Sequence, residues 1–171
     1  MIYDYKRSYE KNAAFYNAHP NAKTALRIGN TALTLAFVLA YAALWIYGLF
    51  NDFSPKDFAK IFTLPVIALL VVSVLRMAID KPRPYDKDGA GITPLVPRNE
   101  RERGSFPSRH LTCAFVISAV FLPYLPVVGI VGIILGCALG YARFALGLHY
   151  PSDLITGGVL GLAIGALAFV F

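Results

Sequence analysis

Long runs without a charged residue constrain this chain more than any other feature of its sequence. Residues 28–51 hold no Lys, Arg, Asp or Glu over 24 positions. Because a helix rises about 1.5 Å per residue, this run is long enough to cross a hydrocarbon core of about 30 Å. Residues 58–79 form a second apolar run, which carries Arg76 near its far end, and predict a second crossing.

A third uncharged run extends over 33 residues, from His110 to Ala142. As one helix it would be about 50 Å long, which is too long for a single crossing. Pro123 and Pro126 lie inside it, and because proline breaks a helix interior they predict two helices here. The sequence therefore predicts an all-α membrane helix bundle with five transmembrane helices, over residues 28–51, 58–79, 108–122, 127–146 and 152–171.

The composition agrees with a membrane domain. Hydrophobic residues make up 57% of the 171 residues and charged residues 15%, whereas about a quarter of an average soluble domain is charged. The whole chain, residues 1–171, is expected to form a single membrane domain. Its net charge of +6 suits an anionic partner. Because the basic residues cluster between apolar spans, a lipid or phosphate partner is favoured over nucleic acid.

Two polar segments lie outside the predicted spans. Residues 1–26 mix aromatic with basic side chains and predict an N-terminal interfacial segment, with a solvated tail as the alternative. Residues 80–107 are rich in Pro, Gly and charge, which favours a loop over a helix. Since polar clusters flank this second segment, we expect it to be the active-site loop.

Three polar clusters lie at the ends of the apolar spans. Each has an ordinary explanation when taken alone: a snorkelling arginine, a proline at the first helical position, or an acidic residue near a helix start. Alternating span directions, however, place all three at one side of the membrane. The clusters are Arg76 with Arg83-Pro84, Pro107-Ser108-Arg109-His110, and Arg143 with His149 and Asp153.

Ionisable groups at this depth are costly and usually serve a function. Several guanidinium groups can neutralise and orient the oxygens of a phosphate. One imidazole can attack phosphorus while Asp153 stabilises it, and the other can protonate the leaving group and then activate water. No carboxylate cluster that could hold magnesium adjoins these residues, so no metal and no cofactor are expected.

The order and spacing of these residues resemble the type 2 phosphatidic acid phosphatase superfamily, which includes lipid phosphate phosphatases and the vanadium haloperoxidases. The resemblance covers residues 76–153. It implies that His149 forms the phosphohistidine, that Asp153 orients it, and that His110 is the general acid. It also implies phosphate binding by Arg76, Arg83, Ser108 and Arg143.

Three positions depart from the family pattern. Arg76 replaces the usual lysine, and Ala142 replaces the usual serine before Arg143. Arg109 lies where glycine is commonest, and we count it as a further phosphate-binding candidate. None of these changes removes a catalytic group. The family commonly has six spans, and the first is here absent or reduced to the N-terminal segment.

The resemblance implies a metal-independent membrane hydrolase that acts on a lipid phosphate or pyrophosphate. Undecaprenyl pyrophosphate, phosphatidylglycerol phosphate and phosphatidic acid are the candidate substrates, and the small size favours the isoprenoid pyrophosphate. A lipid phosphotransferase would use the same residues. An anion transporter is disfavoured because the spans are unequal and carry no inverted repeat.

The two sides of the membrane differ in basic residues. Of the 16 Lys and Arg residues, 14 fall on the catalytic side, and the opposite side has only Lys56 and Lys60. This count predicts a cytoplasmic active site by the positive-inside rule. The family resemblance implies an extracytoplasmic site instead. We expect the extracytoplasmic arrangement, because the basic residues of the catalytic loop also serve substrate capture.

Overall fold

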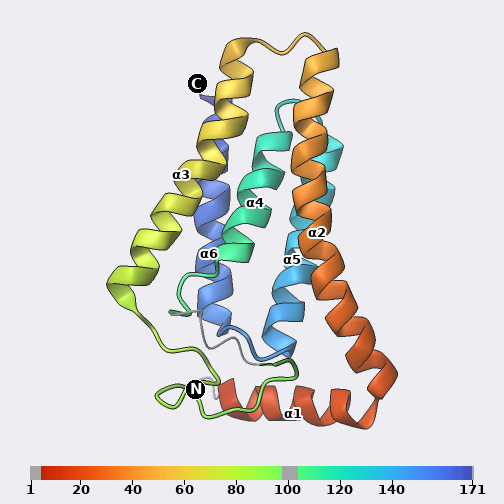
Figure 1. Cartoon of the computed structure of the whole chain (residues 1–171), viewed down its shortest axis with the longest axis vertical. Coiled ribbons are helices and arrows are strands. Elements are labelled where there is room, and N and C mark those ends of the chain that lie inside the picture. Colours follow the sequence, from red (N-terminus) through yellow and green to blue (C-terminus); the bar gives the residue numbers. More distant parts are fainter. Residues whose placement is uncertain (1–4, 98–103, 171) are drawn as a thin grey trace.

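The computed structural model describes residues 5–97 and 104–170. These residues form an all-helical bundle without strands, as predicted. Five helices run along the long axis of the bundle, and α1 lies across one end of it (Figure 1). The elements are α1 (Tyr5–Ala18), α2 (Pro20–Phe50), α3 (Pro55–Ile79), α4 (Arg109–Phe121), α5 (Pro126–Ala145), α6 (Pro151–Gly165) and the 3₁₀ turn η1 (Ala166–Phe169).

Proline begins each of the long helices. Pro20, Pro55, Pro126 and Pro151 each occupy a first-turn position, where the missing N–H costs no helical hydrogen bond. Within residues 5–97 and 104–170, four helices are long and apolar enough to cross a membrane, namely α2, α3, α5 and α6 with η1. The first predicted span starts too late, because α2 begins at Pro20 rather than at residue 28 and continues through polar residues.

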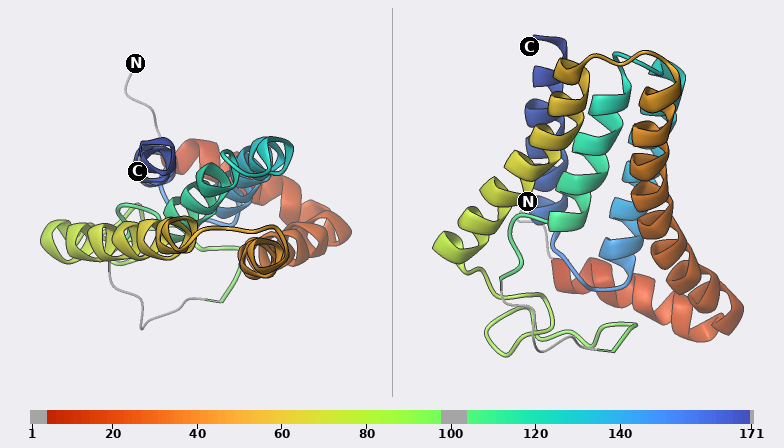
Figure 2. Two further views of the ribbon diagram at one scale, coloured as in Figure 1. Left: turned by 90° about the horizontal axis from the view of Figure 1, so that it is seen from above. Right: turned by 45° about the horizontal axis from the view of Figure 1, so that its top comes forward.

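The remaining apolar helix, α4, is shorter and lies in the middle of the bundle. At 13 residues it is about 20 Å long, less than the hydrocarbon thickness. It contacts α2, α3, α5 and α6, and ten of its residues are buried. A helix that is apolar on every side belongs in a core. Figure 2 shows it between α3, α5 and α6 when the bundle is viewed along its axis.

The two ends of the bundle have different roles in the fold. α2 and α3 are joined at one end and diverge toward the other, where α1 lies (Figure 1). We call these the link end and the α1 end. The polar segment 80–97 and the starts of α4 and α6 are at the α1 end. Tyr9 of α1 donates a hydrogen bond to the Thr93 carbonyl at 2.7 Å, which ties α1 to this segment.

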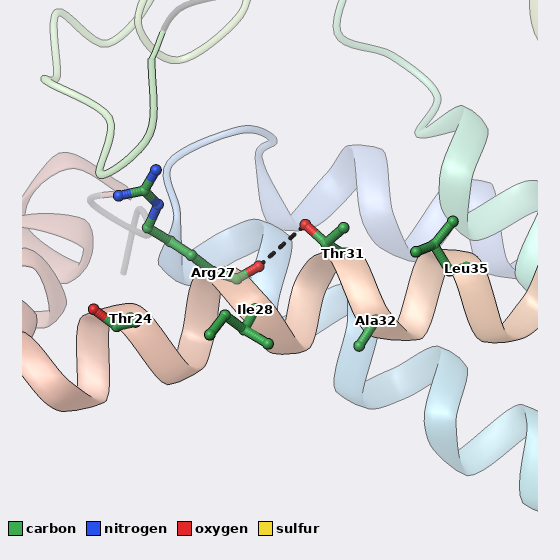
Figure 3. A pocket seen from close by; sticks show the side chains of 6 residues that line it. All are labelled: Thr24, Arg27, Ile28, Thr31, Ala32 and Leu35. Atoms are coloured by element: carbon green, nitrogen blue, oxygen red, sulfur yellow. Dashed lines mark hydrogen bonds between the residues drawn. The ribbon is translucent and has the colours of Figure 1, made fainter.

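The first part of α2 packs against the bundle on one side and is exposed on the other. An open groove of about 580 Å³ runs along it, and Figure 3 shows the side chains that line it. Thr31 donates a hydrogen bond to the Arg27 carbonyl at 3.3 Å within the helix. The side chains that line the groove are exposed, whereas Ala22 and Leu26 in the same stretch pack against protein. The lining residues are Thr24, Arg27, Ile28, Thr31, Ala32 and Leu35.

Candidate active site

Six of the eight predicted site residues are buried in the α1 end of the bundle. They come from the end of α3, the following segment, and the ends of α4, α5 and α6. His110 is half-buried and Arg109 is exposed. Buried charges in a membrane protein are costly and usually functional, so this end is the candidate active site. The six buried residues are Arg76, Arg83, Ser108, Arg143, His149 and Asp153.

A tight turn after α5 brings His149 into this site. The helix ends at Ala145, and Gly147 follows with a φ of 77°, a conformation that favours glycine. A Cβ atom on Gly147 would lie 2.8 Å from the Tyr9 ring, so glycine also permits the close approach of α1. Pro151 then begins α6. His149 is thus held in a short link between two helices and is almost fully buried.

The contacts of His149 define which of its ring nitrogens can react. Its Nδ1 lies 3.0 Å from the Ser105 carbonyl oxygen. A carbonyl can only accept, so Nδ1 carries the proton and Nε2 of the neutral ring keeps its lone pair. Burial, together with the positive charges of Arg83 and Arg143, lowers the pKa of His149 to about 4. The ring is therefore neutral at pH 7, as an attacking nucleophile must be.

Asp153 lies beside His149 but holds it less directly than the resemblance implies. Its Oδ2 is 3.8 Å from His149 Nδ1, which is an ion-pair distance rather than a hydrogen bond. The Ser105 hydroxyl donates to that same Oδ2, and the Tyr150 N–H donates to it at 3.1 Å. Ser105 therefore contacts both partners, through its carbonyl and through its hydroxyl.

Ser108 caps the start of α4 and carries an unused hydroxyl. Its backbone N–H donates to the Asp153 carbonyl at 2.9 Å, which joins α4 to α6. Gly157 permits this approach, since a Cβ there would lie 2.7 Å from the Ser108 carbonyl oxygen. The Ser108 hydroxyl is buried, and no hydrogen-bond partner for it occurs within residues 5–97 and 104–170. A buried polar group without a partner suits a ligand oxygen.

The start of α4 differs from the sequence prediction by two residues. Pro107 was expected at the first helical position, but the helix begins at Arg109 with Ser108 as its N-cap residue. The hydrogen bond from Ser108 to α6 accounts for this, because it keeps Ser108 in an extended conformation.

The arginines of the site also organise the surrounding backbone. Arg76, near the end of α3, donates to the Gly104 carbonyl and, at 3.3 Å, to the Pro107 carbonyl. It thereby fixes the segment that leads into α4. The N–H of Arg83 donates to Asp86 at 2.6 Å in a turn. The Arg76 and Arg83 side chains are both buried, so their positive charges lie inside the site rather than in solvent.

Arg109 and His110 line a cavity of about 250 Å³ between α2, α4 and α5. The other lining residues are almost all apolar, and Cys113 is among them. The charges of Arg143, Arg83 and Arg109 all act on the His110 ring, so His110 lies between the buried charged site and this apolar cavity. The apolar residues that line the cavity include Phe37, Val38, Ala114, Ile117 and Leu139.

The sequence did not single out two residues of the site, Lys81 and Ser105. Lys81 Nζ lies 2.6 Å from Asp153 Oδ1. The sequence did indicate that some cation pairs with Asp153, because a buried carboxylate requires a counter-charge. No spacing rule, however, distinguishes Lys81 from the other basic residues of segment 80–107. Within the described ranges, no three His, Cys, Asp or Glu side chains are placed to hold a metal ion.

Comparisons with known proteins agree with the geometry. The family model of the PAP2 superfamily matches residues 57–171. Undecaprenyl-diphosphatase BcrC of Bacillus subtilis is 29% identical over 137 residues, which cover 80% of this chain and 68% of that protein. A lipid A 1-phosphatase of Rhizobium etli is 34% identical over 106 residues, 60% of this chain and 45% of that protein.

A solved structure has the same fold over nearly the whole chain. The crystal structure of a transmembrane PAP2 type phosphatidylglycerolphosphate phosphatase from Bacillus subtilis superimposes with a TM-score of 0.61. It is 25% identical and covers 95% of this chain and 91% of that one. The family match includes every predicted site residue. This multi-pass membrane protein therefore belongs to the PAP2 superfamily.

Proposed function

We propose that this membrane lipid phosphate phosphatase of the PAP2 type hydrolyses an isoprenoid pyrophosphate through a phosphohistidine on His149. One observation carries the proposal. A buried, neutral imidazole with an available Nε2 lies next to Arg83 and Arg143, and His110 separates this polar site from an apolar cavity. A phosphate fits the first region and a hydrocarbon chain the second.

The reaction has two steps. In the first, the Nε2 lone pair of His149 forms a bond to the terminal phosphorus, and the bond from phosphorus to the leaving oxygen breaks. His110 gives that oxygen a proton, and the lipid monophosphate leaves. In the second, water attacks the phosphohistidine, His110 accepts the water proton, and phosphate is released. Neutral His149 is then restored, and His110 regains the proton that it gave up; a bound phosphate anion stabilises this proton by offsetting the charges of Arg143, Arg83 and Arg109 around the ring.

The phosphate oxygens would be held by Arg76, Arg83, Arg143 and the Ser108 hydroxyl. Guanidinium groups suit this role, since they neutralise the equatorial oxygens of the transition state. The first turn of α4 offers further backbone N–H groups to the same anion. Asp153 would stabilise the positive charge that develops on His149 during the attack.

Two features indicate the substrate class: an apolar cavity that can hold a hydrocarbon chain, and an additional cation, Arg109. Arg109 lies at the cavity beside His110, where it can bind a second phosphate group. An undecaprenyl-diphosphatase is also among the relatives, with 80% of this chain aligned. Lipid A and phosphatidylglycerol phosphate are the alternatives suggested by the other relatives.

A panel of lipid substrates tests this proposal. Purified protein in detergent with EDTA would receive isoprenyl pyrophosphate, isoprenyl phosphate, phosphatidylglycerol phosphate and phosphatidic acid, with released phosphate as the readout. We expect the highest kcat/KM for the pyrophosphate, and inhibition by vanadate, which mimics the five-coordinate transition state. Loss of activity in EDTA with recovery in magnesium would refute the mechanism. Transfer of phosphate to an added lipid alcohol instead of water would indicate a phosphotransferase.

A bulky side chain in the cavity tests where the hydrocarbon lies. Cys113 lines the cavity, whereas Cys137 lies on the exposed side of α5. We expect Cys113→Phe to lower activity on long-chain lipids while activity on a short, soluble phosphate ester is retained. Cys137→Phe, the matched control, should change neither activity. Equal losses on both substrates of Cys113→Phe would contradict this assignment.

The active site is proposed to face the extracytoplasmic side, as the resemblance implies. Lys87 is exposed in the segment between α3 and α4 and suits a labelling test. Cys113 and Cys137 would first be replaced by alanine, and Lys87→Cys would be treated with a membrane-impermeant maleimide in intact cells. Labelling without permeabilisation is expected. Labelling only after permeabilisation would show that the positive-inside rule predicts the topology instead.

A further inference from the structure

Lys81 forms an ion pair with the Asp153 carboxylate. Its Nζ is 2.6 Å from Asp153 Oδ1 and 3.0 Å from the Ser152 hydroxyl. Asp153 is fully buried, whereas the Lys81 side chain is 31% exposed. A buried carboxylate is stable only when it is paired and hydrogen-bonded. Lys81 therefore brings a partly solvated positive charge to an acid that solvent cannot reach.

The position of Lys81 is fixed on several sides. It follows the end of α3, and its carbonyl accepts a hydrogen bond from the Ser105 N–H at 2.7 Å. Its ammonium group lies 4.4 Å from the centre of the Tyr150 ring and 5.5 Å from that of Phe106, within the range of cation–π contacts. Lys81 thus contacts both Ser105, whose carbonyl accepts a hydrogen bond from His149, and Tyr150, the residue after His149.

We propose that Lys81 is a positioning residue of the reaction: it offsets the negative charge of Asp153 and, through Asp153 and Ser105, holds His149 neutral and correctly oriented. This inference rests on the proposed role of His149 as nucleophile. Lys81 touches neither the nucleophilic Nε2 nor the predicted phosphate site. Its effect passes through the carboxylate, which lies 3.8 Å from His149 Nδ1.

The electrostatic argument predicts the direction of the effect. The groups that act on His149 are Arg83, Arg143 and His110, and the Asp153 carboxylate. The Arg83 and Arg143 charges oppose protonation of the ring, and the Asp153 carboxylate favours it. Lys81 offsets the carboxylate. Without Lys81, Ser105 and Tyr150 still donate to Asp153, so the acid stays ionised and its charge draws a proton onto His149 Nε2.

A protonated Nε2 cannot attack phosphorus, so loss of Lys81 should appear in the pH dependence of the reaction. In the wild type, kcat/KM should fall below pH 4, where His149 becomes protonated. In Lys81→Met this acidic limb should move up by about one to three pH units, the range expected for a nearby unneutralised charge. Relative to pH 8, activity at pH 5 should therefore fall by about twofold for a shift of one unit and by about a hundredfold for a shift of three.

Three further variants distinguish this effect from damage to the fold. Lys81→Arg keeps the charge and should keep the acidic limb near that of the wild type. The double variant Lys81→Met/Asp153→Asn removes both charges, so its limb should return to low pH. Lys87→Met removes an exposed lysine of the same segment and should leave the profile unchanged. If Lys81→Met does not fold, Lys81→Gln retains the aliphatic stem over Tyr150 and serves in its place.

The outcomes separate this inference from the proposed function. A loss of activity in Lys81→Met without movement of the acidic limb would refute the positioning role and leave the phosphohistidine mechanism intact. The positioning role would also be refuted if the acidic limb moves in Lys81→Met but the added Asp153→Asn does not reverse the movement. Equal movement of the limb in Lys87→Met would refute it as well. Full activity in His149→Ala would instead refute the proposed function itself. Movement of the limb in Lys81→Met, with recovery in Lys81→Arg and in the double variant, supports the inference.

Discussion

The two ends of the helix bundle differ in the burial and the hydrogen-bond partners of their polar groups. At the link end, α3 begins with a capping box: the Asp57 N–H donates to the Ser54 hydroxyl at 3.3 Å, and the Ser54 N–H donates to Asp57 at 3.0 Å. Tyr124, between α4 and α5, donates to the other Asp57 oxygen at 2.9 Å. Ser54 and Asp57 are three residues apart, Tyr124 joins them from another part of the chain, and all three side chains are exposed or half-buried.

At the α1 end the polar groups are buried and their partners come from distant parts of the sequence. Arg76 binds carbonyls about 30 residues away, and Asp153 meets Lys81 and Ser105 across the bundle. The Ser108 N-cap hydroxyl makes no capping hydrogen bond. The Ser54 hydroxyl at the link end is thus used to cap its helix, whereas the Ser108 hydroxyl at the α1 end has no hydrogen-bond partner within the described residues. Substitutions at the two ends should therefore affect different properties.

The largest effect is expected at His149. We expect His149→Ala to lower kcat by at least the roughly 10²–10⁴-fold range of a single catalytic group, because the proposed mechanism forms its covalent intermediate on His149 Nε2. Phosphate release from the preferred lipid, together with acid-labile ³²P labelling of the protein, measures both steps.

His110→Ala is the matched comparison for that experiment. A general acid matters most when the leaving oxygen is basic, so this variant should lose more activity on phosphatidic acid than on a pyrophosphate. Residual activity in His149→Ala above about a hundredth of the wild type would contradict its role as nucleophile.

A smaller effect is expected at Ser108. Loss of one donor to a phosphate in the transition state typically lowers kcat by about 10²–10³-fold. The loss of kcat in Ser108→Ala should be at or below this range, because the arginines of the site also bind the phosphate oxygens. Its thermal stability should not fall, since its buried hydroxyl has no hydrogen-bond partner within the described ranges. Activity and the unfolding midpoint in detergent would both be measured. A large loss of stability with unchanged kcat would show that Ser108 acts as an ordinary N-cap.

Arg109 should affect substrate choice more than rate. It is exposed beside His110 at the apolar cavity, unlike the other arginines of the site. A charge-assisted hydrogen bond contributes about 1.5–3 kcal/mol, so Arg109→Gly should lower the preference for pyrophosphate over monophosphate by about ten- to a hundredfold. The ratio of the two kcat/KM values is the measurement. An unchanged ratio would mean that Arg109 faces headgroups or solvent and is not part of the phosphate site.

The sequence predicted the apolar helices and the catalytic motif because both leave local signals. Uncharged runs mark the part of a helix that lies in hydrocarbon, but not where the helix itself begins. α2 therefore starts at Pro20, well before the uncharged run. The contacts of Lys81 and Ser105 left no such signal. Each contacts Asp153 from a polar segment whose path depends on tertiary contacts, such as that of Arg76 with the Gly104 carbonyl.

The smallest effect on catalysis is expected at the link end, where Ser54→Ala removes the N-cap of α3. Loss of such a cap typically lowers the free energy of unfolding by about 1 kcal/mol. Ser54 also donates its hydroxyl hydrogen to Asp57 at 2.6 Å, so both halves of the capping box are affected. The variant should unfold at a lower temperature in detergent, and its kcat and KM should match the wild type, because the link end lies across the bundle from His149. A fall in kcat at temperatures where the variant remains folded would show that the two ends are coupled through α3, which follows its N-cap Ser54 and carries Arg76 in its last turn.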